Sequence, residues 1–226
     1  MSGNRVLALI DGFNYYHRLN EFQQKSPRCV KWLNYRSLIE SWLSDEEKQH
    51  LEIIYFSAKA KHRGADVILR HNIYIQALES VNIRCILGEF KPKGIKKCRQ
   101  CERCNGCNSQ QDNKKLERWE EKNTDVNIGI TLLEYTIYNK YDKCLLLSSD
   151  SDFIPAVKRA KEINPNNKII ICPPPIARNK PAKRIEYNID GLEQASKCRA
   201  WLTNFYCIKK HQFQDNYMDI ENPWKI

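Results

Sequence analysis

Four aspartates lie at positions where carboxylates can gather around a metal ion. Asp11 directly follows a run of five apolar residues, and Asp150 and Asp152 come shortly after another apolar run. Asp125 lies at the start of a long helical pattern. A short apolar run that ends in Gly, Asn, Ser or Asp is typical of a buried parallel strand with a polar turn at its carboxyl end. We therefore expect these carboxylates at one edge of a parallel sheet, the edge at which open α/β sheets bind ligands.

Carboxylate oxygens are the ligands that Mg²⁺ and Mn²⁺ prefer. If the four carboxylates converge without an ion, their repulsion raises their pKa values, and a bound divalent cation relieves it. Sites of this kind cleave phosphodiesters by activating a water molecule and stabilising the leaving oxygen. Asn14, one turn beyond Asp11, is placed to orient a carboxylate, a water molecule or a phosphate.

Each aspartate also has a purely structural interpretation. Asp152 could cap a helix that begins at Phe153, Asp125 could offset a helix dipole, and Asp11 could serve only in a turn. All of these at once are less expected than one shared site, because the three segments lead to the same edge of the sheet.

The charge balance favours a polyanionic partner. The chain has 37 Lys and Arg against 27 Asp and Glu, a formal net charge of +10. A basic protein with a local cluster of acids is typical of nucleic-acid recognition at a metal site. The lysines expected to hold an RNA backbone flank the proposed edge: Lys91, Lys93, Lys96, Lys97, Lys114 and Lys115.

The first residues do not resemble a secretory signal, and no stretch approaches the roughly 20 apolar residues that span a bilayer. We therefore expect a cytoplasmic protein that does not enter a membrane. In a reducing compartment the ten cysteines indicate metal binding or burial rather than disulfides.

Four cysteines recur at a constant spacing of three residues: Cys98, Cys101, Cys104 and Cys107. Four thiolates suit a tetrahedral structural Zn²⁺ site. An iron–sulfur cluster is the less favoured alternative, because ferredoxin runs end with a longer spacing and a proline; a redox or free-thiol role also stays open. The six scattered cysteines are expected to be small core residues.

The apolar pattern alternates as in βαβ units. Strands are expected at 6–10, 52–56, 83–90, 143–148 and 168–172, and helices at 35–43, 65–80, 124–138 and 153–163. In the helix at 124–138, Val126, Ile130, Leu133 and Ile137 form one stripe, with Thr124 as its expected N-cap. Weaker signals predict a short helix at 191–195 and an edge strand at 201–206. The pattern predicts an α/β fold with a mainly parallel central sheet.

Three segments carry a family resemblance: 10–17 (IDGFNYYH), 121–127 (EKNTDVN) and 147–155 (LSSDSDFIP). In this order they resemble the motifs of NYN domains of the LabA-like kind, which belong to the PIN-like nuclease group. The resemblance covers about residues 4–175. It implies a three-layer α/β/α, Rossmann-like fold with an acidic pocket for Mg²⁺ or Mn²⁺, and RNA as the usual substrate.

The resemblance also assigns residues. It implies that Asp11, Asp125 and Asp150 bind the metal, that Asp152 is a further acid, and that Asn14 and Ser148 assist them. Related NYN proteins often carry a cysteine-bearing insertion before the second motif, which supports a metal-bound loop here. The chain departs from the family at Ser149, where Gly is common. A serine there is expected either to crowd the backbone or to add a hydroxyl ligand.

These observations predict a metal-dependent endoribonuclease. The expected domain spans residues 1–175 with a Cys-rich insertion at 91–120, and residues 176–226 form an extension packed on the same domain. The main alternative is a non-catalytic RNA-binding or adaptor protein with the same fold. A haloacid dehalogenase phosphatase is disfavoured because Phe13 stands where its second Asp is required. The sequence does not indicate which RNA is cleaved or whether the chain forms a homodimer.

Overall fold

The fold was determined from a computed structural model of the chain. The structure describes residues 4–23, 30–93, 118–174, 193–194, 210–214, 216–217 and 220–224.

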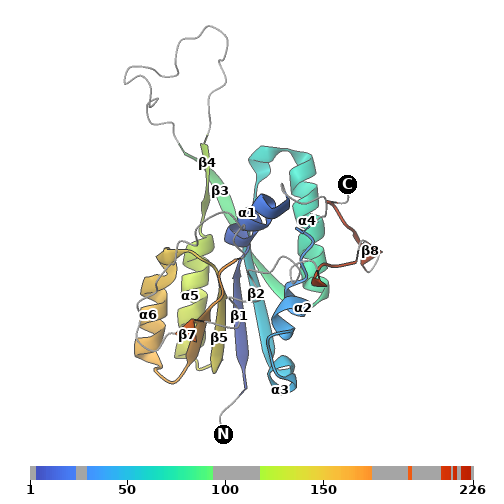
Figure 1. Ribbon diagram of the computed structural model, residues 1–226. Helices are drawn as coiled ribbons and strands as arrows, with labels where there is room; N and C mark the ends of the chain where they lie inside the picture. The colour runs from blue at the N-terminus through green and yellow to red at the C-terminus, as the bar shows by residue number, and fades with distance from the viewer. Residues whose placement is uncertain are drawn as a thin grey trace, which may run out of the picture.

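A seven-stranded sheet with the order β4-β3-β2-β1-β5-β6-β7 forms the centre of the molecule (Figure 1). All neighbouring strands run parallel except β3 and β4, which pair antiparallel. The strands are β1 (Val6–Asp11), β2 (Leu51–Lys59), β3 (Ile83–Lys93), β4 (Arg118–Lys122), β5 (Lys143–Leu147), β6 (Lys168–Ile171) and β7 (Glu193–Gln194). A separate small hairpin joins β8 (Asn216–Tyr217) to β9 (Ile220–Glu221). Since β1 is the middle strand, residues that follow it lie at the centre of the sheet edge.

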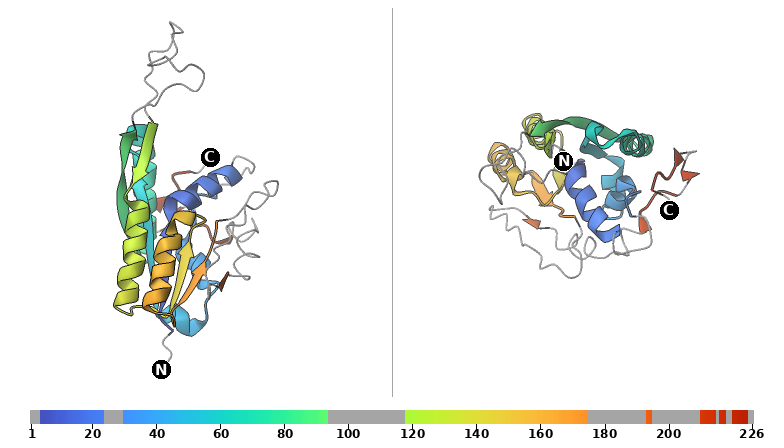
Figure 2. Two further views of the ribbon diagram at one scale, coloured as in Figure 1. Left: turned by 90° about the vertical axis from the view of Figure 1, so that its left-hand side faces the viewer. Right: turned by 90° about the horizontal axis from the view of Figure 1, so that it is seen from above.

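Helices cover both faces of the sheet (Figure 2). On one face lie α1 (Gly12–Gln23), α2 (Tyr35–Glu40) and α4 (Ala65–Ser80), and on the other lie α5 (Thr124–Ile137) and α6 (Ile154–Ile163). Three short helices complete the described elements: α3 (Asp45–Gln49), η1 (Lys61–Arg63) and η2 (Ser151–Phe153). This arrangement confirms the predicted three-layer α/β/α fold.

The alternation of side chains along β1 divides the interior into two cores. Val6, Ala8 and Ile10 contribute to the core under α1, α2 and α4. Leu7 and Leu9 contribute to the core under α5 and α6. All six residues of β1 are buried, because both faces of a parallel sheet are covered by helices.

Three of the four residues in the apolar stripe predicted for α5 face outward, against the usual rule for a packed helix; the fourth, Leu133, packs partly buried against the core under α5 and α6. Val126, Ile130 and Ile137 are each more than half exposed, whereas Ile128 and Leu132 are buried against the sheet. Both sets recur at helical spacing, so periodicity could not choose between them. The packing of the helix onto β1, β2 and β3 decides which set is covered.

Several element boundaries also differ from the sequence-based expectations. The short helix expected at 191–195 is wrong, because Glu193–Gln194 forms a strand that pairs with β6. The helix expected at 35–43 ends at Glu40. Helices α1 and α3 and strand β4 were not predicted as elements. The edge strand expected at 201–206 lies outside the described residues.

Three cysteines in the described residues test the expectation that the scattered cysteines are small core residues. Cys144 and Cys172 lie fully buried in the two cores, and Cys85 packs partly buried against one of them. All three are free thiols. For these positions the prediction of small core residues is confirmed.

An aromatic cluster joins the described C-terminal residues to the sheet side that carries α4. The indole N–H of Trp32 donates to the carbonyl of Gln214 at 3.0 Å. The rings of Phe213 and Trp224 lie 5.2 and 6.1 Å from the Trp32 ring. Among the described residues, no helix has the length and apolar character needed to cross a membrane.

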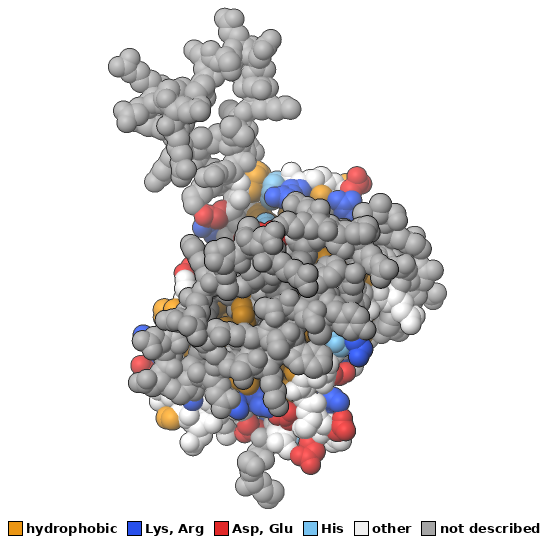
Figure 3. All heavy atoms as spheres, viewed as in Figure 1, with side chains coloured by type: hydrophobic (Ala, Val, Ile, Leu, Met, Phe, Trp, Pro, Cys, Tyr) orange, Lys and Arg blue, Asp and Glu red, His pale blue; other side chains and the backbone are white. Residues whose placement is uncertain are grey.

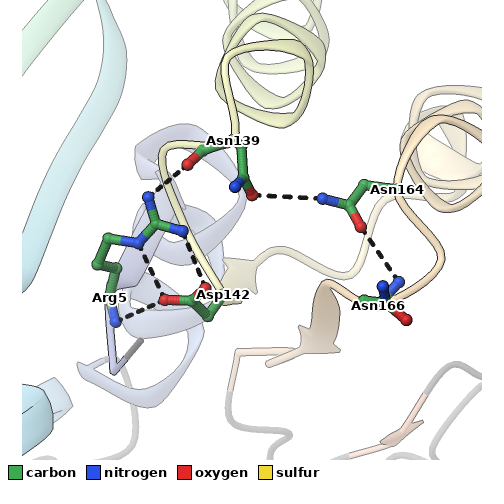
Figure 4. Close-up of polar contacts among 5 residues, drawn as sticks. All are labelled: Arg5, Asn139, Asp142, Asn164 and Asn166. Carbon is green, nitrogen blue, oxygen red and sulfur yellow. Dashed lines mark hydrogen bonds and ion pairs between the residues drawn. The ribbon is translucent and has the colours of Figure 1, made fainter. Parts of the chain in front are cut away.

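A polar network closes the sheet edge opposite the aspartates (Figure 4). The Arg5 guanidinium donates to both carboxylate oxygens of Asp142, at 3.0 and 2.9 Å, and also to the carbonyl of Asn139. Asn164 donates to the Asn139 side chain at 3.3 Å. The network ties the start of β1 to the turn that leads into β5.

We expect Asp142→Asn to lower the free energy of unfolding by about 0.5–1 kcal/mol at pH 7, since both side chains are partly exposed. The hydrogen bond from Arg5 holds the pKa of Asp142 below its ordinary value. The stabilisation that the Arg5–Asp142 pair contributes is therefore present above the ordinary pKa of Asp142, and it is lost as pH falls through the lowered pKa. Urea unfolding of both proteins should show the difference at pH 7 and its disappearance in acid. Glu162→Gln, in an exposed pair with Arg159, is the matched control and should change nothing measurable.

Candidate active site

Asp11 is the buried centre of the candidate site. It ends β1 opposite Phe56 of β2, and it is 3% exposed. One carboxylate oxygen accepts the backbone N–H of Asn14 at 2.9 Å, and the other accepts the Ser148 hydroxyl at 2.8 Å. Burial raises its pKa to about 6; these two hydrogen bonds lower it, and repulsion from Asp125 and Asp150 adds to the rise.

Gly12 allows the chain to turn from β1 into α1 at this point. A Cβ on Gly12 would overlap the Tyr55 ring and would lie 2.6 Å from the carbonyl oxygen of Phe56. The turn therefore requires glycine, and it places Asn14 in the first turn of α1.

Ser148 and Ser149 connect the end of β5 to the residues that follow β1. The Ser148 hydroxyl donates to Asp11 and accepts the backbone N–H of Asp150 at 3.0 Å. The Asn14 amide oxygen accepts both the backbone N–H and the hydroxyl of Ser149, at 3.2 and 2.9 Å. The Ser149 hydroxyl thus holds Asn14 in place, which is a role that the sequence did not predict for it.

Asp150, Asp152 and Asp125 lie nearer the surface than Asp11. One Asp150 oxygen accepts the backbone N–H of Asp152 at 3.0 Å, so Asp150 caps η2. The sequence had suggested a capping role for Asp152 instead. Asp125 is in the first turn of α5. Partial desolvation raises its pKa, and repulsion from Asp150 and Asp152 raises it further. The structure therefore brings the predicted aspartates within electrostatic reach of one another.

Glu121 is a fifth acid that sequence reasoning missed. It lies on β4, and its carboxylate accepts the Thr124 hydroxyl at 2.5 Å. Burial raises its pKa to about 7, and repulsion from Asp11 and Asp125 contributes to the rise. The signal was present in the sequence, because Glu121 opens the second motif, four residues before Asp125.

The structure corrects the predicted start of α5. The N-cap is Asn123 rather than Thr124, and it has a positive φ of 75°. Thr124 is the first helical residue, and its hydroxyl contacts Glu121 instead of closing the helix end. Gly88 makes room for this turn, since a Cβ there would lie 2.5 Å from the Lys122 carbonyl and 2.8 Å from the Thr124 hydroxyl.

The electrostatics of the site favour a bound cation. The charges that raise the pKa values of Asp11, Asp125 and Glu121 are all neighbouring carboxylates. A divalent cation with oxygen ligands would relieve this repulsion, so the donor chemistry fits Mg²⁺ or Mn²⁺. Within the described part of the chain, however, no three acidic, His or Cys side chains are already gathered closely enough to bind one ion.

Most of the predicted accessory residues lie outside the described ranges. These are the four clustered cysteines (Cys98, Cys101, Cys104, Cys107) and four of the lysines (Lys96, Lys97, Lys114, Lys115). Lys93 ends β3, and only its backbone is described. Lys91 is exposed and pairs with Glu89 at 2.8 Å. It lies next to Phe90, so its side chain points to the opposite face of the β3–β4 hairpin from that ring.

A comparison with protein families matches the NYN domain over residues 5–184. Comparisons with curated proteins and with solved structures found no match. The matched range includes β1 to β6 and every acid described above.

Proposed function

Because this chain belongs to the NYN domain family, a family of PIN-like nucleases, we propose that it is a divalent-metal-dependent endoribonuclease of the LabA-like type. The observation that carries the proposal is the group of carboxylates at the carboxyl edge of the sheet. Asp11 and Glu121 are held there with pKa values raised to about 6 and about 7, and their neighbouring charges are carboxylates. Perturbed acids gathered at such an edge are typical of a catalytic site.

In this proposal Asp11, Asp125 and Asp150 hold Mg²⁺ or Mn²⁺, and Asp152 is a further acid at the rim. When bound, the ion supplies Lewis acidity toward water and the scissile phosphate. Ser148 keeps one Asp11 oxygen in a fixed direction. The Asn14–Ser149 contacts hold the two motif segments together.

Glu121 is suited to proton transfer in the same proposal. A carboxylate with a pKa near the working pH can both take and release a proton efficiently. The hydrogen bond from Thr124 fixes one of its oxygens. We propose that Glu121 holds the proton removed from the attacking water.

Three further features belong to the proposal rather than to the described structure. The clustered cysteines would bind Zn²⁺ and fix the segment between β3 and β4. The lysines at 91–97 and 114–115 would bind the RNA backbone, which predicts binding that weakens steeply with salt. The protein would act in the cytoplasm, with homodimer formation open.

The test is cleavage of single-stranded and structured RNA by the purified full chain with Mn²⁺, with Mg²⁺ and with EDTA. Asp150→Asn and Glu121→Gln should each reduce metal-dependent cleavage strongly. Glu79→Gln, an exposed acid at the far end of α4, is the matched control and should cleave normally. Cleavage that survives both site substitutions would contradict the proposed site. RNA binding without any cleavage by the wild type would favour the adaptor alternative.

A further inference from the structure

Five aromatic side chains form an unbroken row of ring contacts at the same edge of the sheet. We call Phe13, His17, Phe90, His62 and Trp119 the aromatic row. The Phe13 ring lies 4.3 Å from His17 and 5.9 Å from Phe90. The His62 ring lies 5.1 Å from Phe90 and stacks on Trp119 at 4.6 Å, with only 2° between the planes. None of the five belongs to either hydrophobic core formed by the described residues.

The aromatic row starts at the carboxylates and leads away from them. Phe13 is two residues beyond Asp11. Phe90 lies directly opposite Glu121 in the antiparallel β3–β4 pair, so the two side chains share one face of the hairpin. Trp119 is two residues from Glu121 on β4 and therefore lies on that face as well. A ligand that reaches the acids along the hairpin would pass over these rings.

The row is accessible and uncharged. Phe13 is 37% exposed, and Phe90, His62 and Trp119 are partly exposed. Desolvation, and after it the nearby Arg63 charge, lowers the pKa of both His17 and His62. Both shifts favour the neutral imidazole over the charged one.

Basic side chains lie beside the row. Lys61 and Arg63 flank His62 in η1 and are exposed. Arg63 is close enough to lower the pKa of both histidines, so its charge lies near His17 and near His62. Figure 3 shows hydrophobic, histidine and basic side chains gathered over the segment between β2 and α4. Aromatic faces next to cations are the combination that binds bases and phosphates of a single strand.

We propose that the aromatic row, with Lys61 and Arg63, is a stacking platform for the bases of single-stranded RNA that lead into the carboxylate site. The inference rests on the proposed function and adds a binding surface for the substrate to it. Bases in a duplex are stacked on each other and cannot lie on aromatic side chains, whereas unpaired bases can. Single-stranded RNA is therefore the substrate that this surface selects.

The platform is tested by binding, separately from cleavage. Asp150→Asn protein in EDTA is titrated with a short labelled unstructured RNA and with a duplex of the same length. Adding Phe13→Leu or Trp119→Leu should weaken single-strand binding by about fivefold or more and leave duplex binding unchanged. Tyr138→Leu, which changes an exposed aromatic at the C-cap of α5, is the matched control and should bind normally. Arg63→Gln should weaken binding and reduce its dependence on salt.

Each outcome separates the two proposals. If Phe13→Leu and Trp119→Leu both bind single strands as Tyr138→Leu does, the platform is wrong even when the wild type cleaves RNA. If the aromatic substitutions weaken binding but the wild type never cleaves, the platform stands and the nuclease proposal fails. Phe13→Leu changes an exposed ring, so it keeps the test valid if Trp119→Leu disturbs the hairpin.

Discussion

Replacing Asp11 by Asn is expected to abolish metal-dependent RNA cleavage while making the folded protein more stable. The loss of activity should be on the order of a thousandfold or more, as when a residue acting directly in catalysis is removed. The gain in stability follows from the raised pKa. Burial raises the pKa of Asp11 from 3.8 to about 6, a shift that corresponds to about 3 kcal/mol at about 1.4 kcal/mol per pKa unit.

The pH dependence follows from the same shift. Because the folded protein binds this proton more tightly than the unfolded chain does, the contribution of Asp11 to stability is full below pH 3.8 and is lost as pH rises through about 6. The amide of the Asp11→Asn variant carries no charge. Its oxygen can accept the Asn14 N–H and its nitrogen can donate to the Ser148 oxygen, so both polar neighbours keep a partner.

Thermal unfolding in EDTA at pH 5 and pH 8 measures this effect. The wild type should lose stability between the two pH values by clearly more than Asp11→Asn does. Mn²⁺ should then raise the Tm of the wild type and not that of the variant, because an ion that binds only the folded state stabilises it. A variant that is less stable than the wild type at pH 8 would show that the Asp11 charge is already balanced and that the site is not a cation pocket.

Replacing Gly12 by Ala is expected to cost several kcal/mol of folding free energy. The added Cβ would overlap the Tyr55 ring and approach the Phe56 carbonyl oxygen at 2.6 Å. Tyr55 is buried among other aromatic rings of the core, and the carbonyl belongs to β2, so neither can move easily. Overpacking of this kind typically costs about 1–3 kcal/mol, and here it meets two rigid groups.

The control for this prediction is another glycine of the same chain. A Cβ on Gly129 of α5 would meet only the Ala156 Cβ at 3.6 Å, an ordinary contact. Gly129→Ala should therefore stabilise the protein by up to about 1 kcal/mol through helix propensity. Urea unfolding of both variants gives the comparison. Equal effects of the two substitutions would mean that the strand-to-helix turn after β1 can rearrange.

Asp11 and Asp150 could be placed from sequence because their position depends on a local rule. An apolar run followed by polar turn residues marks the carboxyl end of a buried strand, and both β1 and β5 obey it. Glu121 could not be placed in this way. Strand β4 has the polar sequence RWEEK and pairs antiparallel at the sheet edge, so it carries no run of apolar residues. Its position depends on pairing with β3, which the sequence does not encode locally.

The orientation of α5 shows a second limit of prediction from sequence. Ile128 and Leu132 face the sheet, while Val126 and Ile130 face outward, although both pairs have the same spacing. Only the tertiary contact decides between them. The aromatic row was invisible for a similar reason, since its members come from α1, η1, β3 and β4 and meet only in the folded chain.

The central position of β1 sets the order in which the site can be built during synthesis. β1 is the first of the described strands, but its neighbour β5 begins at Lys143. The hydrogen bond between Asp11 and Ser148 spans 137 residues of sequence, and Asp150 comes later still. A ribosome must therefore add Ser148, 137 residues after Asp11, before this carboxylate meets its partner on the chain segment after β5. Unfinished chains that stop before β5 lack these contacts, so the carboxylate site assembles only after contacts across 137 residues of sequence have formed.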